Sequence, residues 1–162
     1  MTAILIVCTA NICRSPMTQG IMGKLVLEQG LDNTISVDSA GTHAHNAGRR
    51  PYKRAQQVAE SHGVKISKYK ARMVAADDFK QFDYIIAMDQ DNLRNLRAIC
   101  PEECKDKLSL ILDFAPQSGL KTVHDPYFGN LSGFTPCKTF IRGRLTWGSI
   151  FGYHSCPKWV IG

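Results

Sequence analysis

Long apolar runs are absent from this chain of 162 residues. No segment approaches the roughly 20 consecutive apolar residues that a helix needs to span a bilayer. The amino-terminus also lacks a basic start, a long apolar stretch and a small-residue cleavage site, because the apolar run at residues 4–7 is only four residues long. We therefore expect a cytoplasmic protein with no membrane partner.

Zinc-type cysteine pairs are missing as well. The six cysteines include no C-x2-C pair, and Cys100 and Cys104 have no His or further Cys beside them. His43 and His45 form a pair without a third ligand. Because a cytosolic chain keeps its thiols reduced, we expect no disulfide framework. The missing ligand clusters lead us to expect no metal, and we expect no cofactor.

Acidic residues are missing from the last 28 residues. Residues 135–162 hold four basic residues, whereas the rest of the chain has 16 basic against 14 acidic residues. The net charge of +6 is therefore interpreted as largely a property of this tail. Without a nucleic-acid motif or interleaved aromatic residues, it indicates a general attraction to acidic partners and no nucleic-acid partner.

Predicted strands and helices alternate along the chain. Apolar runs predict four strands, at residues 4–7, 34–37, 84–88 and 108–112. Helical spacing predicts helices at residues 15–30, 53–62, 77–82 and 89–99. Residues 38–51 are predicted to form a loop. The alternation favours an α/β fold, a three-layer doubly wound structure whose parallel four-stranded sheet is flanked by helices and carries its site at the carboxyl ends of the strands.

The most informative segment follows the first predicted strand and runs Cys8-Thr9-Ala10-Asn11-Ile12-Cys13-Arg14-Ser15. A strand, a short loop and the start of a helix point backbone N–H groups and the positive helix end at one volume beside a thiol, which suits an anion. The same field favours the thiolate of Cys8, the nucleophilic form of cysteine. Arg14 adds a planar fork for phosphate-like oxygens.

This C-x5-R-S pattern resembles the low-molecular-weight protein tyrosine phosphatase family. The likeness covers residues 3 to about 134 and includes a second motif, Asp125-Pro126-Tyr127-Phe128-Gly129. It implies that the protein hydrolyses phosphotyrosine in protein substrates through a phosphocysteine intermediate. Cys8 would be the nucleophile, Arg14 the phosphate clamp and Asp125 the general acid.

The resemblance also implies supporting roles around the loop. The loop from Thr9 through Ala10, Asn11, Ile12 and Cys13 would hold the phosphate oxygens. Ser15 would donate its hydroxyl to the sulfur; a plain helix N-cap is the other interpretation, and the two roles are compatible. Asn11 would be buttressed by residues that map to Ser39 and His62. A solvated histidine or a partner of a helix dipole is the alternative for His62.

Substrate preference would depend on the pocket walls. Tyr127 and Phe128 would line one side, and the opposing wall falls near His45. Ile12 favours phosphotyrosine, because relatives directed at phosphoarginine tend to have threonine there. Cys13 lies within disulfide reach of Cys8 and either protects the nucleophile reversibly or simply fills apolar space.

Two other activities fit parts of the pattern. An arsenate reductase of the same fold needs two relay cysteines just after the strand at 84–88, where this chain has Asp89 to Asn92 and no cysteine before Cys100. A phosphocysteine carrier needs neither Arg14 nor Asp125. An inactive binding module is a third possibility.

The carboxyl-terminal segment departs from the family. We expect a phosphatase domain over residues 1–146 and an atypical tail over residues 147–162. The tail is either the product of an altered reading frame or a divergent segment that packs through Trp147, Phe151 and Trp159. The oligomeric state does not follow from the sequence.

Overall fold

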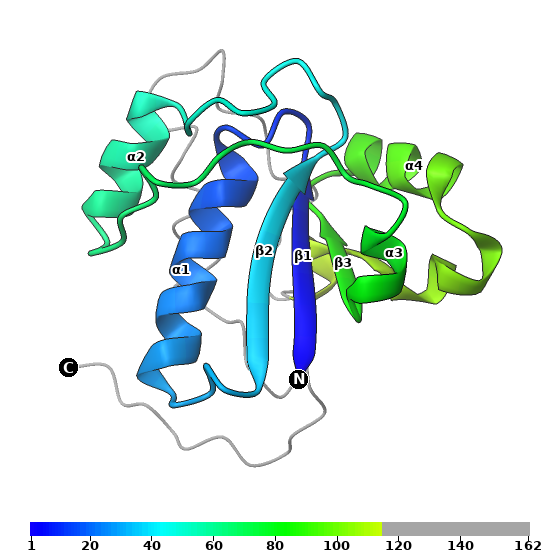
Figure 1. The fold of residues 1–162 in the computed structure, drawn as a ribbon, viewed down its shortest axis with the longest axis horizontal. Helices are drawn as coiled ribbons and strands as arrows, with labels where there is room; N and C mark the ends of the chain where they lie inside the picture. Colours follow the sequence, from blue (N-terminus) through cyan, green and yellow to red (C-terminus); the bar gives the residue numbers. More distant parts are fainter. Residues whose placement is uncertain (115–162) are drawn as a thin grey trace.

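The computed structural model describes residues 1–114, and the expectations for Asp125, Tyr127, Phe128 and the tail lie outside them. The described strands are β1 (Thr2–Cys8), β2 (Ile35–Gly41), β3 (Tyr84–Ala87) and β4 (Leu108–Leu110). The helices are α1 (Arg14–Glu28), α2 (Lys53–Glu60), α3 (Asp78–Gln81) and α4 (Gln90–Ile99), with short 3-10 helices at Glu102–Lys107 and Ile111–Phe114 (Figure 1).

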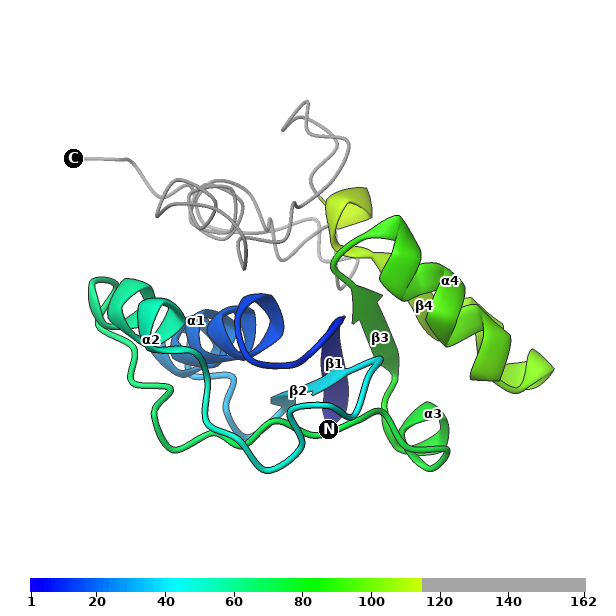
Figure 2. The same cartoon turned by 90° about the horizontal axis from the view of Figure 1, so that it is seen from above.

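The four strands form one parallel sheet in the order β2-β1-β3-β4, which confirms the predicted fold class. Helices α1 and α2 lie on one side of the sheet, and α3 and α4 lie on the other (Figure 2). The residues of β1 alternate between the apolar clusters on the two faces of the sheet. Ile4 and Ile6 belong to the apolar cluster under α1 and α2, and Leu5 and Val7 to the cluster under α3 and α4. A strand covered on both faces is therefore apolar at every position.

Strand β2 extends further than its sequence pattern indicates. The residues Asp38-Ser39-Ala40-Gly41 were expected in a loop, but they pair with β1 as far as Cys8. Their small or polar side chains carry no apolar periodicity, so the parallel register and not the pattern makes them a strand. Strand β4 is shorter than predicted and ends at Leu110, where a 3-10 turn begins.

The carboxyl ends of three strands meet at one edge of the sheet. Cys8 at the end of β1 pairs with Gly41 at the end of β2, and Val7 pairs with Ala87 at the end of β3. The chain enters α1 after β1 and α4 after β3, so two helix amino-termini begin at the same edge. None of the helices in residues 1–114 has the length and apolar character needed to cross a membrane.

Candidate active site

The loop between β1 and α1 folds around the sulfur of Cys8. Cys8 is buried, and its Sγ lies 3.0 Å from the hydroxyl of Ser15 and accepts a hydrogen bond from the backbone N–H of Asn11 at 3.3 Å. Asn11 has a φ of 55°, the left-handed region that costs an ordinary residue about 1–3 kcal/mol. The surrounding contacts must therefore hold this residue in place.

Gly41 gives the loop room to lie against the sheet. A Cβ at this position would lie 2.8 Å from the backbone oxygen of Thr9 and 3.1 Å from the backbone nitrogen of Asn11. These neighbours are backbone atoms, so they cannot move aside as a flexible side chain would. The end of β2 thus admits the loop only because it is a glycine.

The side chain of Asn11 uses every polar group it has. Its Nδ2 donates to the hydroxyls of Ser15 at 2.8 Å and Ser39 at 2.9 Å, and its Oδ1 accepts from the backbone N–H of Arg72 at 2.9 Å. The loop is thereby tied to α1, to β2 and to the segment before α3. The extension of β2 is what brings Ser39 within reach.

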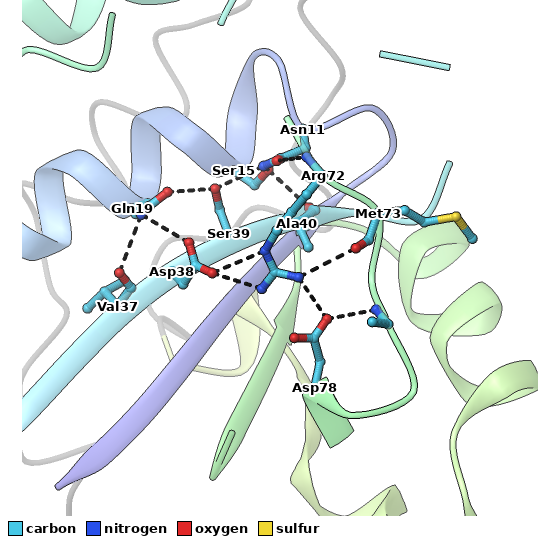
Figure 3. Close-up of polar contacts among 11 residues, drawn as sticks. Asn11, Ser15, Gln19, Val37, Asp38, Ser39, Ala40, Arg72, Met73 and Asp78 are labelled. Atoms are coloured by element: carbon cyan, nitrogen blue, oxygen red, sulfur yellow. Dashed lines mark hydrogen bonds and ion pairs between the residues drawn. The ribbon is translucent and has the colours of Figure 1, made fainter. Parts of the chain in front are cut away.

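A closed ring of hydrogen bonds supports this arrangement, and we call it the Asn11 ring (Figure 3). From Asn11 it passes to Ser39, whose hydroxyl donates to Oε1 of Gln19 at 2.7 Å. Nε2 of Gln19 donates to Oδ1 of Asp38 at 3.2 Å. Asp38 accepts from Nη2 of Arg72 at 2.8 Å, and the backbone N–H of Arg72 returns to Asn11.

Arg72 is held by two carboxylates. Besides Asp38, its Nη1 donates to the buried Asp78 at 2.9 Å. Burial lowers the pKa of Arg72, but the hydrogen bonds that its guanidinium donates to Asp78 and Asp38 outweigh burial, so its pKa lies above the ordinary value. The sequence motifs gave no signal for Arg72 or Gln19, because neither lies in the C-x5-R-S loop and their partners are distant in sequence.

His62 lies away from Asn11, which makes its expected support of this residue wrong. It follows α2 beside the carboxyl-terminal half of α1, where its carbonyl accepts from Nζ of Lys24 at 3.0 Å. Lys24 is ten residues beyond Arg14, or about 15 Å along a helix. The Ser39 hydroxyl donates its hydrogen bond to Oε1 of Gln19.

Arg14 is fully buried at the start of α1, and its guanidinium pairs with the carboxylate of Asp89, which lies between β3 and α4. Its Nη1 lies 2.6 Å from Oδ2 of Asp89, and its Nη2 donates to the hydroxyl of Thr9 at 3.2 Å. Asp89 also caps α4 by accepting from the backbone N–H of Asn92 at 2.7 Å. The amide of Asn92 lies 3.0 Å from the Thr9 hydroxyl. In the sequence, the stretch from Asp89 to Asn92 is notable only for its lack of relay cysteines, and no contact with Arg14 follows from it.

The remaining loop residues differ in whether they face Cys8 or pack in the apolar core. Cys13 is the buried N-cap residue of α1, so Ser15 lies inside the helix and its hydroxyl faces Cys8, which excludes the N-cap alternative. Ile12 packs in the apolar cluster with α1 and α2, and its carbonyl accepts from Tyr52. Ala10 is partly buried against the same cluster.

His45 stands on an exposed turn after β2, where its ring stacks on His43 with centroids 5.9 Å apart. Within residues 1–114, no group of three or more His, Cys, Asp or Glu side chains could hold a metal ion. The described part of the site is thus a thiol that accepts the N–H of Asn11, the neighbouring Ser15 hydroxyl and the buried guanidinium of Arg14, which together suit a tetrahedral oxyanion.

Comparison with known proteins agrees with this geometry. The family model for "Low molecular weight phosphotyrosine protein phosphatase" matches residues 3–147. The curated protein of that name from Schizosaccharomyces pombe is 40% identical over 135 residues, covering 83% of this chain and 86% of the relative. Its human counterpart is 40% identical over 134 residues, covering 82% and 84%.

Solved structures show the same likeness. A protein tyrosine phosphatase from Entamoeba histolytica superposes with a TM-score of 0.83 at 36% identity, covering 87% of this chain and 90% of that one. YfkJ from Bacillus subtilis superposes with a TM-score of 0.86 at 34% identity, covering 96% and 98%. The match extends over most of the chain and includes the loop that surrounds Cys8, so this protein belongs to the low molecular weight phosphotyrosine protein phosphatase family.

Proposed function

We propose that the protein hydrolyses phosphotyrosine in proteins in two steps, through a phosphocysteine formed on Cys8. As a member of its family the chain is a cysteine-dependent protein-tyrosine phosphatase. The observation that carries the two-step mechanism is the environment of the Cys8 sulfur. The sulfur accepts a hydrogen bond from the N–H of Asn11 and lies against the Ser15 hydroxyl. Both groups belong to the loop and the first turn of α1, where Arg14 also lies.

In the first step the thiolate of Cys8 attacks phosphorus, and the bond to the tyrosine oxygen breaks on the opposite side. Backbone N–H groups from Thr9 to Cys13 and the guanidinium of Arg14 hold the three equatorial oxygens, where charge accumulates. Asp89 keeps the guanidinium oriented toward them. Asp125 gives its proton to the departing phenolate.

In the second step water attacks the phosphocysteine. Asp125 now takes a proton from the water, the P–S bond breaks, and inorganic phosphate leaves. The hydroxyl of Ser15, already 3.0 Å from Sγ, donates to the sulfur as negative charge returns to it. The same contact therefore stabilises the thiolate before the first step and after the second.

Hydrolysis of p-nitrophenyl phosphate and of a phosphotyrosine peptide tests the activity, and rapid mixing tests the intermediate. A burst of p-nitrophenol equal to the enzyme concentration supports the phosphocysteine. Cys8→Ser should reduce kcat by at least about 10⁴-fold. A linear time course with no trapped phosphoenzyme from quenched reactions would remove the two-step scheme.

The role of Asp125 is tested with two leaving groups. Asp125→Asn should slow the hydrolysis of phenyl phosphate far more than that of p-nitrophenyl phosphate, because a good leaving group needs less protonation. Equal slowing of the two substrates would mean that another group is the acid.

Arsenate reduction is disfavoured by the position of the remaining cysteines. Cys100 follows the last residue of α4, a ten-residue helix that begins at the site edge, so it lies about 15 Å along the helix from that edge. A relay disulfide with Cys8 needs Cα atoms within about 7 Å. Turnover of arsenate with thioredoxin would reverse this conclusion. A pure phosphate carrier would show no steady hydrolysis.

Further elements of the proposal concern the surroundings of the site. Tyr127 and Phe128 would form one wall of the substrate pocket, with His45 near the other. Cys13 would trap an oxidised Cys8 as a disulfide. Residues 1–146 would form the phosphatase domain. A cytoplasmic location suits a nucleophile that must stay reduced.

A further inference from the structure

Positive charge is concentrated between β2 and α3. Residues 42–74 hold eight of the 20 Lys and Arg residues but one of the 14 Asp and Glu residues, so they carry a net charge of +7. All other residues together carry −1. The excess charge of the chain therefore lies mainly in this segment and not, as expected, in the last 28 residues.

The structure places this segment against the catalytic loop. The backbone N–H of Tyr52, just before α2, donates to the carbonyl of Ile12 at 2.7 Å. The segment that follows α2 returns beside it, where the N–H of Ala71 donates to the carbonyl of Arg49 at 2.8 Å. Figure 1 shows both stretches passing the carboxyl ends of β1 and β2.

Five exposed cations of this segment form what we call the basic rim: Arg49, Arg50, Lys53, Arg54 and Lys70. The ion pairs within residues 1–114 join other cations to the acidic residues, and none of them involves Arg49, Arg50 or Lys53. Among the described residues, no carboxylate therefore neutralises these three side chains, which can attract an external anion.

Helix stability does not explain the charges at the start of α2. Lys53 and Arg54 occupy its first turn, which contains no acidic residue. The helix dipole favours acidic side chains at this end and disfavours cations. The amino-terminus of α2, which lies beside the catalytic loop, therefore combines the positive end of the helix dipole with two positive side chains.

We propose that the basic rim binds acidic residues flanking the phosphotyrosine of a protein substrate, so that the preferred substrate is phosphotyrosine within an Asp- and Glu-rich segment. The inference rests on the proposed phosphatase function, because the phosphate ester bound at Cys8 brings the flanking residues to the rim. Arg49 and Arg50 suit carboxylates, which a guanidinium binds with two parallel hydrogen bonds. A peptide is favoured over a lipid surface or a nucleic acid because the rim is joined to the loop through Tyr52.

The test compares three phosphotyrosine peptides of equal length, with acidic, neutral or basic flanks, on the full chain. The readout is kcat/KM for each peptide divided by kcat/KM for p-nitrophenyl phosphate, which has no flanks. At low ionic strength the acidic peptide should exceed the neutral one by about tenfold, or about 1.4 kcal/mol. The advantage should shrink in 1 M NaCl, where the screening length falls to about 3 Å.

A charge-matched pair of variants locates the effect. Arg49→Gln/Arg50→Gln/Lys53→Gln should remove most of the preference for acidic flanks. Lys80→Gln/Arg94→Gln/Arg97→Gln removes the same charge from exposed positions on α3 and α4, across the sheet, and should retain the preference.

The outcomes separate this inference from the proposed function. A chain that hydrolyses all three peptides equally well overturns the rim and leaves the phosphatase intact, whereas a chain inactive on every substrate overturns the phosphatase. Equal loss in both triple variants would show an effect of net charge alone and would overturn the rim. Rim-dependent binding to phosphatidylserine vesicles or RNA, with no preference among the peptides, would also overturn it.

Discussion

At the scale of single residues, the loop from Cys8 to Ser15 depends on side chains outside its own motif. Asn11 is held in a left-handed conformation by Ser39 from β2 and by the backbone of Arg72. Arg14 is oriented by Asp89, which follows β3. The motif thus supplies the groups that we propose to react, and distant residues supply their geometry.

Gly41 offers a direct test of the close approach between β2 and the loop. Gly41→Ala should lower the free energy of unfolding by about 1–3 kcal/mol, because its Cβ meets backbone atoms, and should reduce kcat by displacing the loop. Gly23→Ala is the matched control, since a Cβ there meets nothing within 4 Å. It should stabilise α1 by about 0.5–1 kcal/mol and leave kcat unchanged. Urea denaturation and steady-state assays measure both, and an active, stable Gly41→Ala chain would contradict the packing argument.

Gln19 should be a positioning residue whose effect shows in the pH profile. In Gln19→Glu a carboxylate replaces the donor that faces Asp38 at 3.2 Å, so two negative charges repel each other at neutral pH. Protonation of Glu at low pH restores a donor. The ratio of kcat/KM between variant and wild type should therefore rise as pH falls from 8 toward 5.

Gln19→Met serves as the comparison, because it loses the three hydrogen bonds of the amide, to Val37, Asp38 and Ser39, at every pH. Its ratio to wild type should be low and flat. A flat ratio for Gln19→Glu as well would show that the contact between Gln19 and Asp38 does not reach the catalytic loop.

At the scale of elements, β1, β3 and four helices could be predicted, but the ends of β2 and β4 could not. Apolar runs and helical spacing identify elements that bury a face, so β1 and β3 are plain in the sequence. The last four residues of β2 are small or polar, and only the register with β1 makes them a strand. Ser39 lies in that part of β2, which is why its element could not be predicted from the pattern.

Asp89, at the start of α4, both caps this helix and orients Arg14. Asp89 accepts from the N–H of Asn92 through Oδ1 and pairs with Arg14 through Oδ2. Asp89→Asn keeps an N-cap oxygen but removes the charge opposite a buried guanidinium, a loss that costs about 3–5 kcal/mol for a buried pair. This pair is partly exposed on the Asp89 side, so the cost should fall below that range.

Activity should respond more strongly than stability in Asp89→Asn. A misplaced Arg14 should lower kcat/KM by about 10- to 100-fold, since small displacements of a catalytic group have effects of this size. Steady-state kinetics and thermal denaturation on the same preparation compare the loss of activity with the loss of stability. An unchanged kcat/KM in a folded variant would show that Arg14 orients without Asp89.

At the scale of the whole molecule, the fold class and the position of Cys8 at the end of the first strand could be predicted from the sequence, whereas the Asn11 ring could not. Alternating strands and helices indicate a parallel sheet, and a thiol at the end of its first strand indicates the site edge. The ring joins residues up to 61 positions apart through side chains such as Gln19 and Arg72, which have no motif. The resemblance suggested that His62 supports Asn11 together with Ser39. In the structure it is Gln19 that contacts Ser39 within the ring.

The domain boundary predicted at residue 146 can be tested with the truncated chain. A protein of residues 1–146 should hydrolyse p-nitrophenyl phosphate with kcat within about twofold of the full chain if the tail is outside the functional domain. Thermal denaturation of both chains gives the contribution of the tail to stability. A large loss of activity together with a lower Tm would show that the aromatic residues of the tail pack against the domain.

The Asn11 ring couples occupancy of the loop to folding of the chain. The eight residues from Cys8 to Ser15 are contiguous, yet their shape exists only when β2 and the segment that contains Arg72 are in place. An oxyanion therefore binds the complete fold and has no site in a partly folded chain. By linkage, phosphate at 100 times its Kd should raise the free energy of unfolding of the whole domain by about 2.7 kcal/mol. The reaction product is in this sense a ligand that stabilises its own enzyme.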